Sequence, residues 1–459
     1  MKYLFRLYRS DIVATLRLSY PIVIGQLGMV LMGVADTVMV GRLGAAELGA
    51  AGIATSIFMV VSIVGMGTLS VIAPQIATAK GLDDKAACGR LLRSGMLLSL
   101  VLSLVLGVIL LLLQSYFEIF QQKPEINERA KDFLLIISIS IIPLLLFNAV
   151  KQFSDGLSHT RIAMYITVVG LLINVFLNWL LIPGRWGFPA WGLNGAGVAT
   201  LVARTWMAII MVVYVWKSPT FHDYIRANQL QGSLLPLINK LFRLGLPGGL
   251  QYFFEVAAFA GAAIIIGWLG KYPLAAHQVA INLAGITYMM ASGFSFAGAI
   301  RVGEAVGLGN QAKVVRAGSV ALLMVGSFMV FCCVLFLTTN QLLISLYMDD
   351  PQVTEIATSL VIIAGFFQLS DGIQVVGLGI LRGLADVNIP TFITLLAYWL
   401  IGLPLGYLLA FKLGMGAQGI WIGLLVGLSI SAILLTTRFY HLASVARRLV
   451  SQSEKSLFG

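Results

Sequence analysis

The sequence predicts an all-α integral membrane protein whose twelve transmembrane helices form two six-helix lobes, related by an axis along the membrane normal. Three observations lead to this prediction: the composition, twelve apolar segments of spanning length, and an internal repeat. Hydrophobic residues make up 59% of the 459 residues, charged residues make up only 11%, and the mean hydropathy is +0.94. An ordinary soluble domain carries about a quarter charged residues, so this composition indicates a chain that lies in lipid.

The apolar segments are roughly 20 to 27 residues long and rich in Gly, Ala, Leu and Ile, which suits packed helices rather than the short alternating strands of a barrel. The first segment continues well past the length of a signal-peptide core without a small-residue cleavage site, so we expect it to stay in the mature protein. In chain order, the expected helices cover residues 13–40, 48–78, 92–114, 131–153, 161–183, 194–216, 241–269, 274–300, 315–339, 354–381, 389–411 and 416–438.

The basic residues indicate the orientation of the chain. Twelve spans put both termini on one side, and that side collects 22 of the 30 Lys and Arg, against seven in the opposite loops and Arg204 inside a span. The positive-inside rule then places both termini in the cytoplasm. Because the basic residues are spread over every second loop, the net charge of +11 does not indicate a nucleic-acid partner. The expected partners are the lipid bilayer and small molecules.

An internal repeat divides the chain into two halves. A shift of 226 residues places several residues of the first half on identical residues of the second: Pro21 on Pro247, Gly41 on Gly267, Gly44 on Gly270, Gly81 on Gly307 and Arg90 on Arg316. We therefore predict an amino-terminal lobe over 1–216, a polar cytoplasmic linker over 217–240 and a carboxyl-terminal lobe over 241–459. Each lobe has an even number of spans, so both have the same orientation, which suits a carrier that works by alternating access.

Three carboxylates, Asp36, Glu255 and Asp371, lie well inside apolar spans. Each costs roughly 3 kcal/mol on insertion scales, so each needs a reason. At 1.5 Å per residue, Glu255 lies about 16 Å and Asp371 about 14 Å from the cytoplasmic side, which puts them at one depth in one lobe. The shift of 226 residues places Asp36 on Ala262 and Glu255 on Met29, and a near-equal shift of 227 places Asp371 on Leu144. None of these counterparts is acidic, so packing symmetry does not require the three acids.

Amide side chains accompany the two acids of the second half. Gln251 lies one turn before Glu255, and Gln368 and Gln374 lie three residues on either side of Asp371. In the next span, Gln278 lies one turn before Asn282. Polar groups facing lipid would lack partners, so these faces are expected to point into the lobe or its cavity. Two interpretations stay open: the acids bind a cation, or they are structural groups held by hydrogen bonds from the amides.

The first half has its own polar group. Asp36, Asn178 and Thr200 reach a similar depth in the outer half of the membrane, Asn174 is one turn from Asn178, and Ala196 is one turn from Thr200. A single carboxylate with several neutral oxygens can hold a small hard cation, or it can take up a proton. A purely structural hydrogen-bond cluster is the alternative.

Several motifs carry a family resemblance: VADTVMVGRLG, INVFLNWLLI, GLNGAGVATLVAR, LAAHQVAINLAGITYMM, IRVGEAVG and MDDPQV. Together with the repeated half, they make essentially the whole chain resemble the multidrug and toxic compound extrusion (MATE) transporters, in the NorM branch. The resemblance implies twelve helices in two lobes. It also implies a multi-pass protein of the bacterial inner membrane, expected as a monomer, that exports lipophilic cationic compounds in exchange for Na⁺ or H⁺ and contributes to antibiotic resistance.

The resemblance also implies functional residues. In NorM-like proteins the carboxyl-lobe cation site uses acids that match Glu255 and Asp371, with an aromatic residue matching Tyr288 nearby. We add Gln278 and Asn282 to this candidate site. In related members the amino-lobe site uses positions that match Asp36, Asn174, Asn178 and Thr200. We add Ala196 to this second candidate site. Both sets are present, so the sequence does not choose between the lobes; Na⁺ is the favoured coupling ion.

Other functions receive less support. A flippase for lipid-linked oligosaccharides also fits two lobes, but it would need several basic residues for a pyrophosphate, and Arg204 is the only one expected deep in a span. An enzyme would need nucleophilic or metal-binding groups at the bilayer surface, and none are evident. No phosphate-binding GxxxxGK[ST] occurs, which argues against direct ATP drive. No cofactor is expected, and no resident metal beyond Na⁺ at the two candidate sites.

Overall fold

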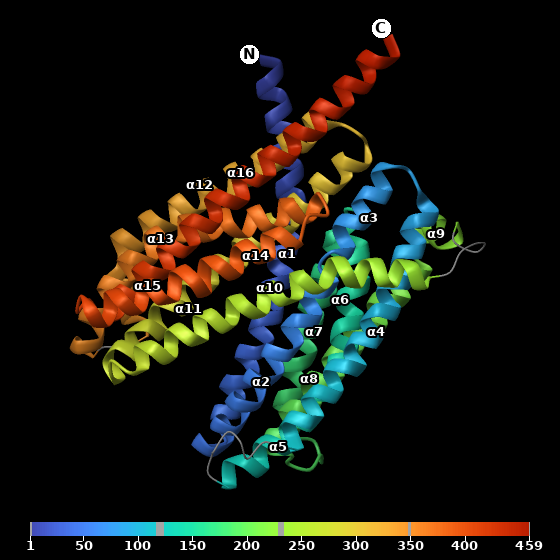
Figure 1. The fold of residues 1–459 in the computed structure, drawn as a ribbon. Helices are drawn as coiled ribbons and strands as arrows, with labels where there is room; N and C mark the ends of the chain where they lie inside the picture. Colours follow the sequence, from blue (N-terminus) through green and yellow to red (C-terminus); the bar gives the residue numbers. More distant parts are fainter. Residues whose placement is uncertain (1, 116–123, 228–233, 348–349, 459) are drawn as a thin grey trace. The chain divides into compact units, whose positions relative to one another are not determined.

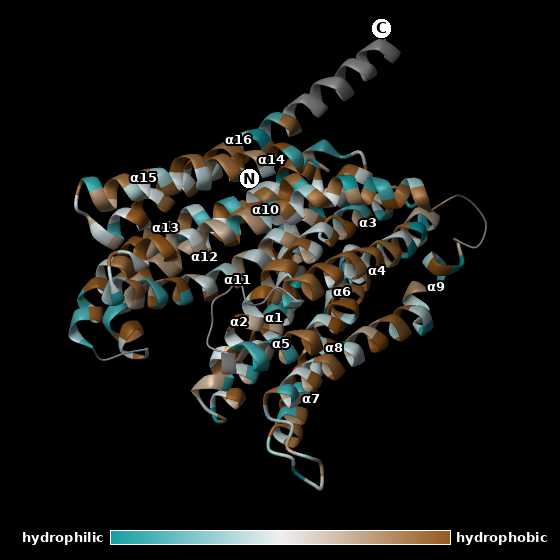
Figure 2. Ribbon diagram, turned by 60° about the horizontal axis from the view of Figure 1, so that its bottom comes forward, coloured by the Kyte–Doolittle hydropathy of each residue, from teal (hydrophilic) through white to brown (hydrophobic). Residues whose placement is uncertain are grey.

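The computed structural model describes the backbone of residues 2–115, 124–227, 234–347 and 350–458, and the side chains of these ranges except those of 2–7, 124–125 and 445–458. Within the described residues, twelve helical segments are long and apolar enough to cross a membrane. The predicted fold class is therefore confirmed. Figure 2 shows long hydrophobic stretches along these helices, with hydrophilic residues gathered toward helix ends and connections.

Several predicted spans are built from more than one helical element (Figure 1). Residues 45–81, 126–156 and 388–412 each form one span from consecutive pieces. The elements are α1 (Lys2–Gly41), α2 (Ala45–Leu69), α3 (Ile72–Gly81), α4 (Lys85–Ser115), α5 (Pro124–Ile139), α6 (Ile141–Gly156), α7 (Thr160–Leu181), α8 (Gly192–Lys217), α9 (Pro219–Arg226), α10 (Leu235–Gly267), α11 (Lys271–Gly307), α12 (Gln311–Ser345), α13 (Pro351–Gly383), α14 (Asn388–Leu395), the π-helical η2 (Leu396–Gly402), α15 (Leu403–Tyr407), the π-helical η3 (Leu408–Lys412) and α16 (Gly416–Phe458).

Local sequence explains where helices begin. Gly44 and Gly270, which the repeat aligns, precede α2 and α11 with φ of 139° and 121°, a backbone region that glycine adopts most easily. Asp350 caps α13, since its Oδ1 accepts hydrogen bonds from two backbone N–H groups, at 2.9 and 3.3 Å, and Pro351 occupies the first helical position. The two halves of the repeat thus share a turn as well as a sequence pattern.

The chain groups into two compact units. Residues 21–250 form one, called the amino-terminal unit below, and residues 1–20 with 251–459 form the other, the carboxyl-terminal unit. This grouping differs from the predicted lobes in where the long helices α1 and α10 are divided. The predicted linker 217–240 contains α9 and the first turns of α10, and its residues 228–233 lie outside the described residues.

Contacts explain these divisions. The buried Asp11 of α1 accepts hydrogen bonds from Arg301 of α11 and Arg316 of α12, which joins the start of α1 to the carboxyl-terminal unit. Gly245 and Gly249 of α10 bring that helix so close to α2 that added Cβ atoms would lie 2.1 Å from the carbonyl oxygen and 2.5 Å from the hydroxyl of Thr68. These glycines join the first half of α10 to the amino-terminal unit.

In the carboxyl-terminal unit, α13 packs against α11, α12 and α16 (Figure 1). Its contact with α11 is backbone to backbone. A Cβ added at Gly379 would lie 2.4 Å from the carbonyl oxygen of Ser295, and one added at Gly383 would lie 2.7 Å from that of Ala299. Two glycines four residues apart permit such close packing of membrane helices. This contact fixes how α13 presents its polar face.

Candidate functional site

The amino-terminal unit contains a complete hydrogen-bond cluster around the half-buried Asp36 of α1. Asp36 Oδ1 accepts from the Nδ2 atoms of Asn174 and Asn178, both on α7, at 3.1 and 2.6 Å. Asp36 Oδ2 accepts from the Thr200 hydroxyl of α8 at 2.7 Å. Asn174 and Asn178 are fully buried, and Thr200 is nearly so. The structure therefore brings together four of the five residues predicted for this lobe.

The donors of this cluster all point at the carboxylate, an arrangement that suits a negatively charged Asp36. Asn178 Nδ2 also donates to Asn174 Oδ1 at 3.3 Å, and Asn178 Oδ1 is buried with no hydrogen-bond partner among the described residues. To bind a cation, the amides would turn so that their oxygens face the ion. Ala196 is buried one turn before Thr200 on α8 and contributes no side-chain hydrogen bond to the cluster.

Arg204 also belongs to this neighbourhood. Its Nη1 donates to the Ser140 hydroxyl at 2.7 Å, and its guanidinium lies 4.8 Å from the centre of the Phe58 ring. It lies one turn after Thr200 on α8, and its charge reaches Asp36. The sequence placed this arginine inside the span but gave it no partner. In the structure it is the positive counterpart of the acid.

The carboxyl-terminal unit holds Glu255 of α10 and Asp371 of α13, which are 5% and 3% exposed. The two carboxylates are close enough for their charges to repel. Among the described residues neither forms a hydrogen bond with the protein. These acids differ in this respect from Asp36, whose two oxygens are both occupied by donors.

The amides near the two acids do not hold them. Gln368 Oε1 accepts from the Thr287 hydroxyl at 2.6 Å, and Gln374 Oε1 accepts from the Tyr398 hydroxyl at 3.3 Å. The Nε2 atoms of both glutamines, and both amide atoms of Gln251, are buried without a hydrogen-bond partner among the described residues. The structure thus lacks the amide hydrogen bonds on which the structural interpretation of the acids depended. Unpaired amide groups beside unpaired carboxylates are groups available to a ligand.

Three of the five residues predicted for this lobe come together. The half-buried Tyr288 of α11 lies within electrostatic reach of both Glu255 and Asp371. Gln278 and Asn282 lie further toward the start of α11, where both are exposed and Gln278 Nε2 donates to Asn282 Oδ1 at 3.3 Å. Neither contacts the acids, so their predicted part in a cation site rests on the sequence alone.

The sequence analysis missed two functional candidates, Arg382 and Tyr398. Arg382, 5% exposed, donates from Nη1 to the Tyr252 hydroxyl at 3.1 Å, and its guanidinium lies 5.0 Å from the centre of that ring. Tyr398 is fully buried in the π-helical η2, and it lies within electrostatic reach of both acids. One signal was available for Arg382, because eleven residues, about three helical turns, separate it from Asp371 and put both on one face.

No group of three or more His, Cys, Asp or Glu side chains that could hold a metal ion occurs among the described residues. A cation at either site would therefore rely mainly on amide, hydroxyl and backbone oxygens beside one or two carboxylates. Such hard oxygen ligands suit Na⁺ better than a transition metal.

Comparison with known proteins identifies the family. The MatE family model matches twice, over residues 21–180 and 247–408. The two matches start at Pro21 and Pro247, which reproduces the 226-residue shift of the predicted repeat. The chain is 33% identical to the probable multidrug resistance protein NorM of Brucella suis biovar 1 (strain 1330), over 95% of this chain and 94% of that protein. It is 35% identical to the multidrug resistance protein MdtK of Proteus mirabilis (strain HI4320), over 94% and 96%.

Solved structures share the fold. A MATE protein in its bent conformation superposes with a TM-score of 0.88 at 20% identity, covering 97% of this chain and 98% of that one. The eukaryotic MATE transporter AtDTX14 superposes with a TM-score of 0.86 at 20% identity, covering 96% and 99%. The predicted twin-lobe, twelve-helix architecture is thus the architecture of these transporters. The two matches of the family model and the full-length relatives together show that the chain belongs to the MatE family, as a NorM-like MATE transporter.

Proposed function

We propose that this protein is a cation-coupled antiporter that exports lipophilic cationic drugs and toxic compounds by alternating access, using Na⁺ or H⁺ as the coupling ion. One observation carries the proposal: Glu255 and Asp371 are buried, mutually repelling and without hydrogen bonds among the described residues. A buried carboxylate without a protein partner is costly, and a bound cation or proton removes this cost by neutralising the charge. The names of the NorM and MdtK relatives, which are multidrug resistance proteins, support the same substrate class.

The chemistry is an exchange of positive charges. A coupling ion or proton that enters the carboxyl-terminal site relieves the repulsion between Glu255 and Asp371, and a cationic drug can do the same. The two are therefore alternative occupants of one site, and each stabilises the conformation in which it is bound. Buried aromatic side chains beside the acids, such as Tyr398, give a lipophilic cation apolar surface and ring faces to pack on.

The Asp36 cluster is the second proposed ion site. Its carboxylate, hydroxyl and amide groups come from α1, α7 and α8, so filling or emptying it changes how these three helices are held together. An ion that turns the amides of Asn174 and Asn178 would replace their two donor contacts to Asp36 with oxygen ligands. We propose that this rearrangement couples ion binding to conformational change in the amino-terminal unit.

The flippase alternative receives no support from the site. The arginines nearest the two candidate sites each lie beside an acid of their own unit, Arg204 beside Asp36 and Arg382 beside Glu255. An anionic pyrophosphate would need basic residues that are free to bind it. We further propose a monomer in the bacterial inner membrane with both termini in the cytoplasm, as the distribution of Lys and Arg predicts.

Cells that make this protein are expected to accumulate less ethidium and related lipophilic cations than cells that lack it, because the transporter returns the dye to the medium. Dye fluorescence in whole cells, or in vesicles with an imposed ion gradient, measures the difference. Vesicles without a gradient are the control. Equal retention with and without verified expression, across several cationic dyes, would show that the proposed substrate class is wrong.

A sodium pulse at fixed pH is expected to drive dye transport in proteoliposomes, whereas a pH jump in sodium-free buffer drives less. The oxygen-rich Asp36 cluster and the Glu255–Asp371 pair both suit Na⁺. A sodium ion needs several oxygen ligands, which the neighbouring amides can supply, whereas a proton needs only a carboxylate. The measurement is the initial rate of dye movement under each gradient. Transport under the pH jump alone would assign the coupling to protons.

A further inference from the structure

The carboxyl-terminal site contains three charged side chains, one of them positive. Glu255 is close enough to interact electrostatically with Arg382 as well as with Asp371. Asp371 and Arg382 lie on one face of α13, about three turns and about 16 Å of helix rise apart, and Glu255 of α10 interacts with both. Two negative charges, those of Asp371 and Glu255, and the positive charge of Arg382 therefore interact inside the membrane-spanning part of the unit.

Arg382 is held in place by contacts that leave it able to act on the site. Tyr252, one turn before Glu255 on α10, accepts a hydrogen bond from Nη1, and its ring lies under the guanidinium. Nε of Arg382 is buried with no hydrogen-bond partner among the described residues. Tyr288 interacts with both acids and with Arg382. The guanidinium is thus fixed beside Glu255 through Tyr252 rather than through a direct bidentate ion pair.

We propose that Arg382 sets the fixed charge of the carboxyl-terminal site and so makes the site selective for one singly charged cation at a time. This inference rests on the proposed antiport function and specifies the charge of its substrate. Arg382 acts through Glu255, and is therefore a positioning residue.

The balance of charges in the site accounts for this selectivity. With both acids ionised, the two carboxylates and Arg382 sum to one net negative charge. One Na⁺, one proton or one monocationic drug makes the site neutral, and a second cation would then enter a buried region that no longer attracts it. A dication would leave an uncompensated buried positive charge, which is costly. The site therefore holds either one coupling ion or one drug molecule at a time, and antiport requires this alternation.

The test uses a matched pair of dyes, the monocation ethidium and its dicationic derivative propidium, bound to purified protein in nanodiscs and followed by fluorescence. We expect Arg382→Gln to raise the ratio of propidium affinity to ethidium affinity by about tenfold, since the site gains one net negative charge. Arg382→Lys should keep the parental ratio. Competition by Na⁺ should also become steeper in Arg382→Gln, because two sodium ions are then needed to neutralise the acids.

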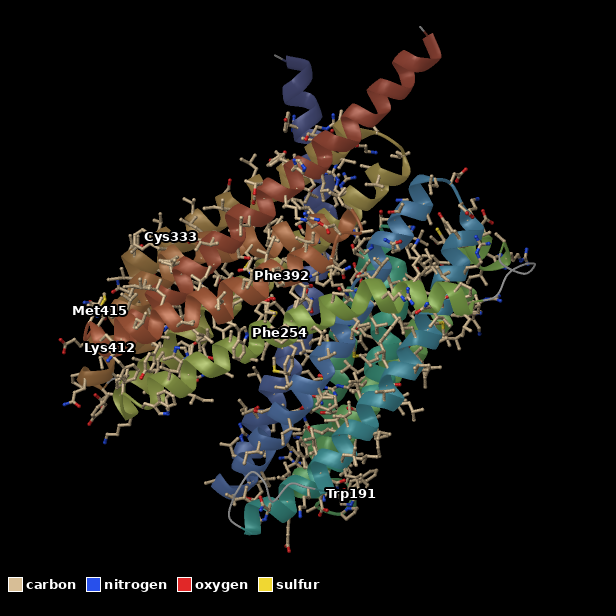
Figure 3. All side chains as sticks on the ribbon, in the orientation of Figure 1. Trp191, Phe254, Cys333, Phe392, Lys412 and Met415 are labelled. Carbon is tan, nitrogen blue, oxygen red and sulfur yellow. The ribbon has the colours of Figure 1, made fainter. Side chains whose placement is uncertain are left out.

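Lys412→Gln is the matched control, because it removes one positive charge from the same unit at an exposed position. Figure 3 shows Lys412 near Met415 at one end of the helices and Phe254, which precedes Glu255, well away from it. This control should leave the dye ratio unchanged. An unchanged ratio in folded Arg382→Gln, or an equal change in Lys412→Gln, would overturn the inference.

A charge-rescue variant keeps the inference testable if Arg382→Gln alone is unstable. Glu255→Gln leaves the site with no net charge, and the double variant Glu255→Gln, Arg382→Gln restores one net negative charge. The double variant should therefore bind ethidium about tenfold more tightly than Glu255→Gln. Equal binding by the two variants contradicts the inference while the parental transport stands. A parent that neither binds nor exports cationic dyes would overturn the proposed function, and the inference with it.

Discussion

Glu255→Gln and Asp371→Asn are each expected to abolish gradient-driven dye efflux while leaving a folded protein in the membrane. The amides keep the shape of the side chains but lose the charge that attracts the coupling ion and the drug. At about 4 Å and an effective dielectric constant of about 20, a charge pair contributes about 4 kcal/mol before desolvation, so a loss of two orders of magnitude or more in rate is expected. The initial rate of dye efflux per transporter in proteoliposomes measures this effect.

Folding should be little affected by these two substitutions. Neither carboxylate forms a hydrogen bond with the described residues, so no hydrogen bond is removed. Each substitution also ends the repulsion between the two carboxylates, which in Glu255→Gln offsets the lost attraction to Arg382. Thermal unfolding in detergent is expected to show equal or higher stability than the parent. Glu355→Gln provides the control, since Glu355 is exposed on the same helix as Asp371. Glu255→Gln that is made at normal levels and pumps at the parental rate would show that Glu255 is a structural group.

Asp36→Asn is expected to impair both transport and stability, because this acid is fully engaged with the protein. Three donors, from Asn174, Asn178 and Thr200, converge on its two oxygens. An amide at this position must turn its own NH₂ group toward one of them. The resulting loss is about 1 to 3 kcal/mol of unfolding free energy, in addition to slower ion-driven efflux. Both quantities are measured on the same purified protein, by thermal unfolding and by efflux rate.

The comparison with Glu255→Gln separates the two sites. We expect lost transport without lost stability in the carboxyl-terminal site, and loss of both in the amino-terminal cluster. Thr37→Ala is the control on α1, because the Thr37 hydroxyl is exposed and donates only to the Gly33 carbonyl oxygen of its own helix, at 2.9 Å. If Asp36→Asn lowers stability but leaves sodium-driven efflux at the parental rate, the cluster is a structural hydrogen-bond network and the coupling ion binds elsewhere.

The sequence alone determined the number of helices, the repeat and the depth of the polar residues. Helix number follows from hydropathy, because every backbone group in lipid must be satisfied within its own segment. Depth follows from the fixed rise of 1.5 Å per residue, and this was sufficient to group Asp36 with Asn174, Asn178 and Thr200. These residues lie on α1, α7 and α8 and have short side chains. When the three helices pack together, short polar side chains at the same depth come into contact.

Only the tertiary structure decided which side chains meet in the carboxyl-terminal unit. Gln368 and Gln374 lie on the stripe of Asp371, yet they bond to Thr287 and Tyr398 rather than to the acid. Gln278 and Asn282 have the spacing of a polar stripe, yet both are exposed.

Arg382 follows the predicted span 354–381 by one residue, yet it is buried beside Tyr252 and its charge reaches Glu255. The physical reason is that spacing along one helix fixes which residues share a face, but not what that face meets. Contacts such as those of Gly379 and Gly383 with the backbone of α11 set the rotation and the separation of neighbouring helices. Those two quantities then determine which partners a long side chain can reach.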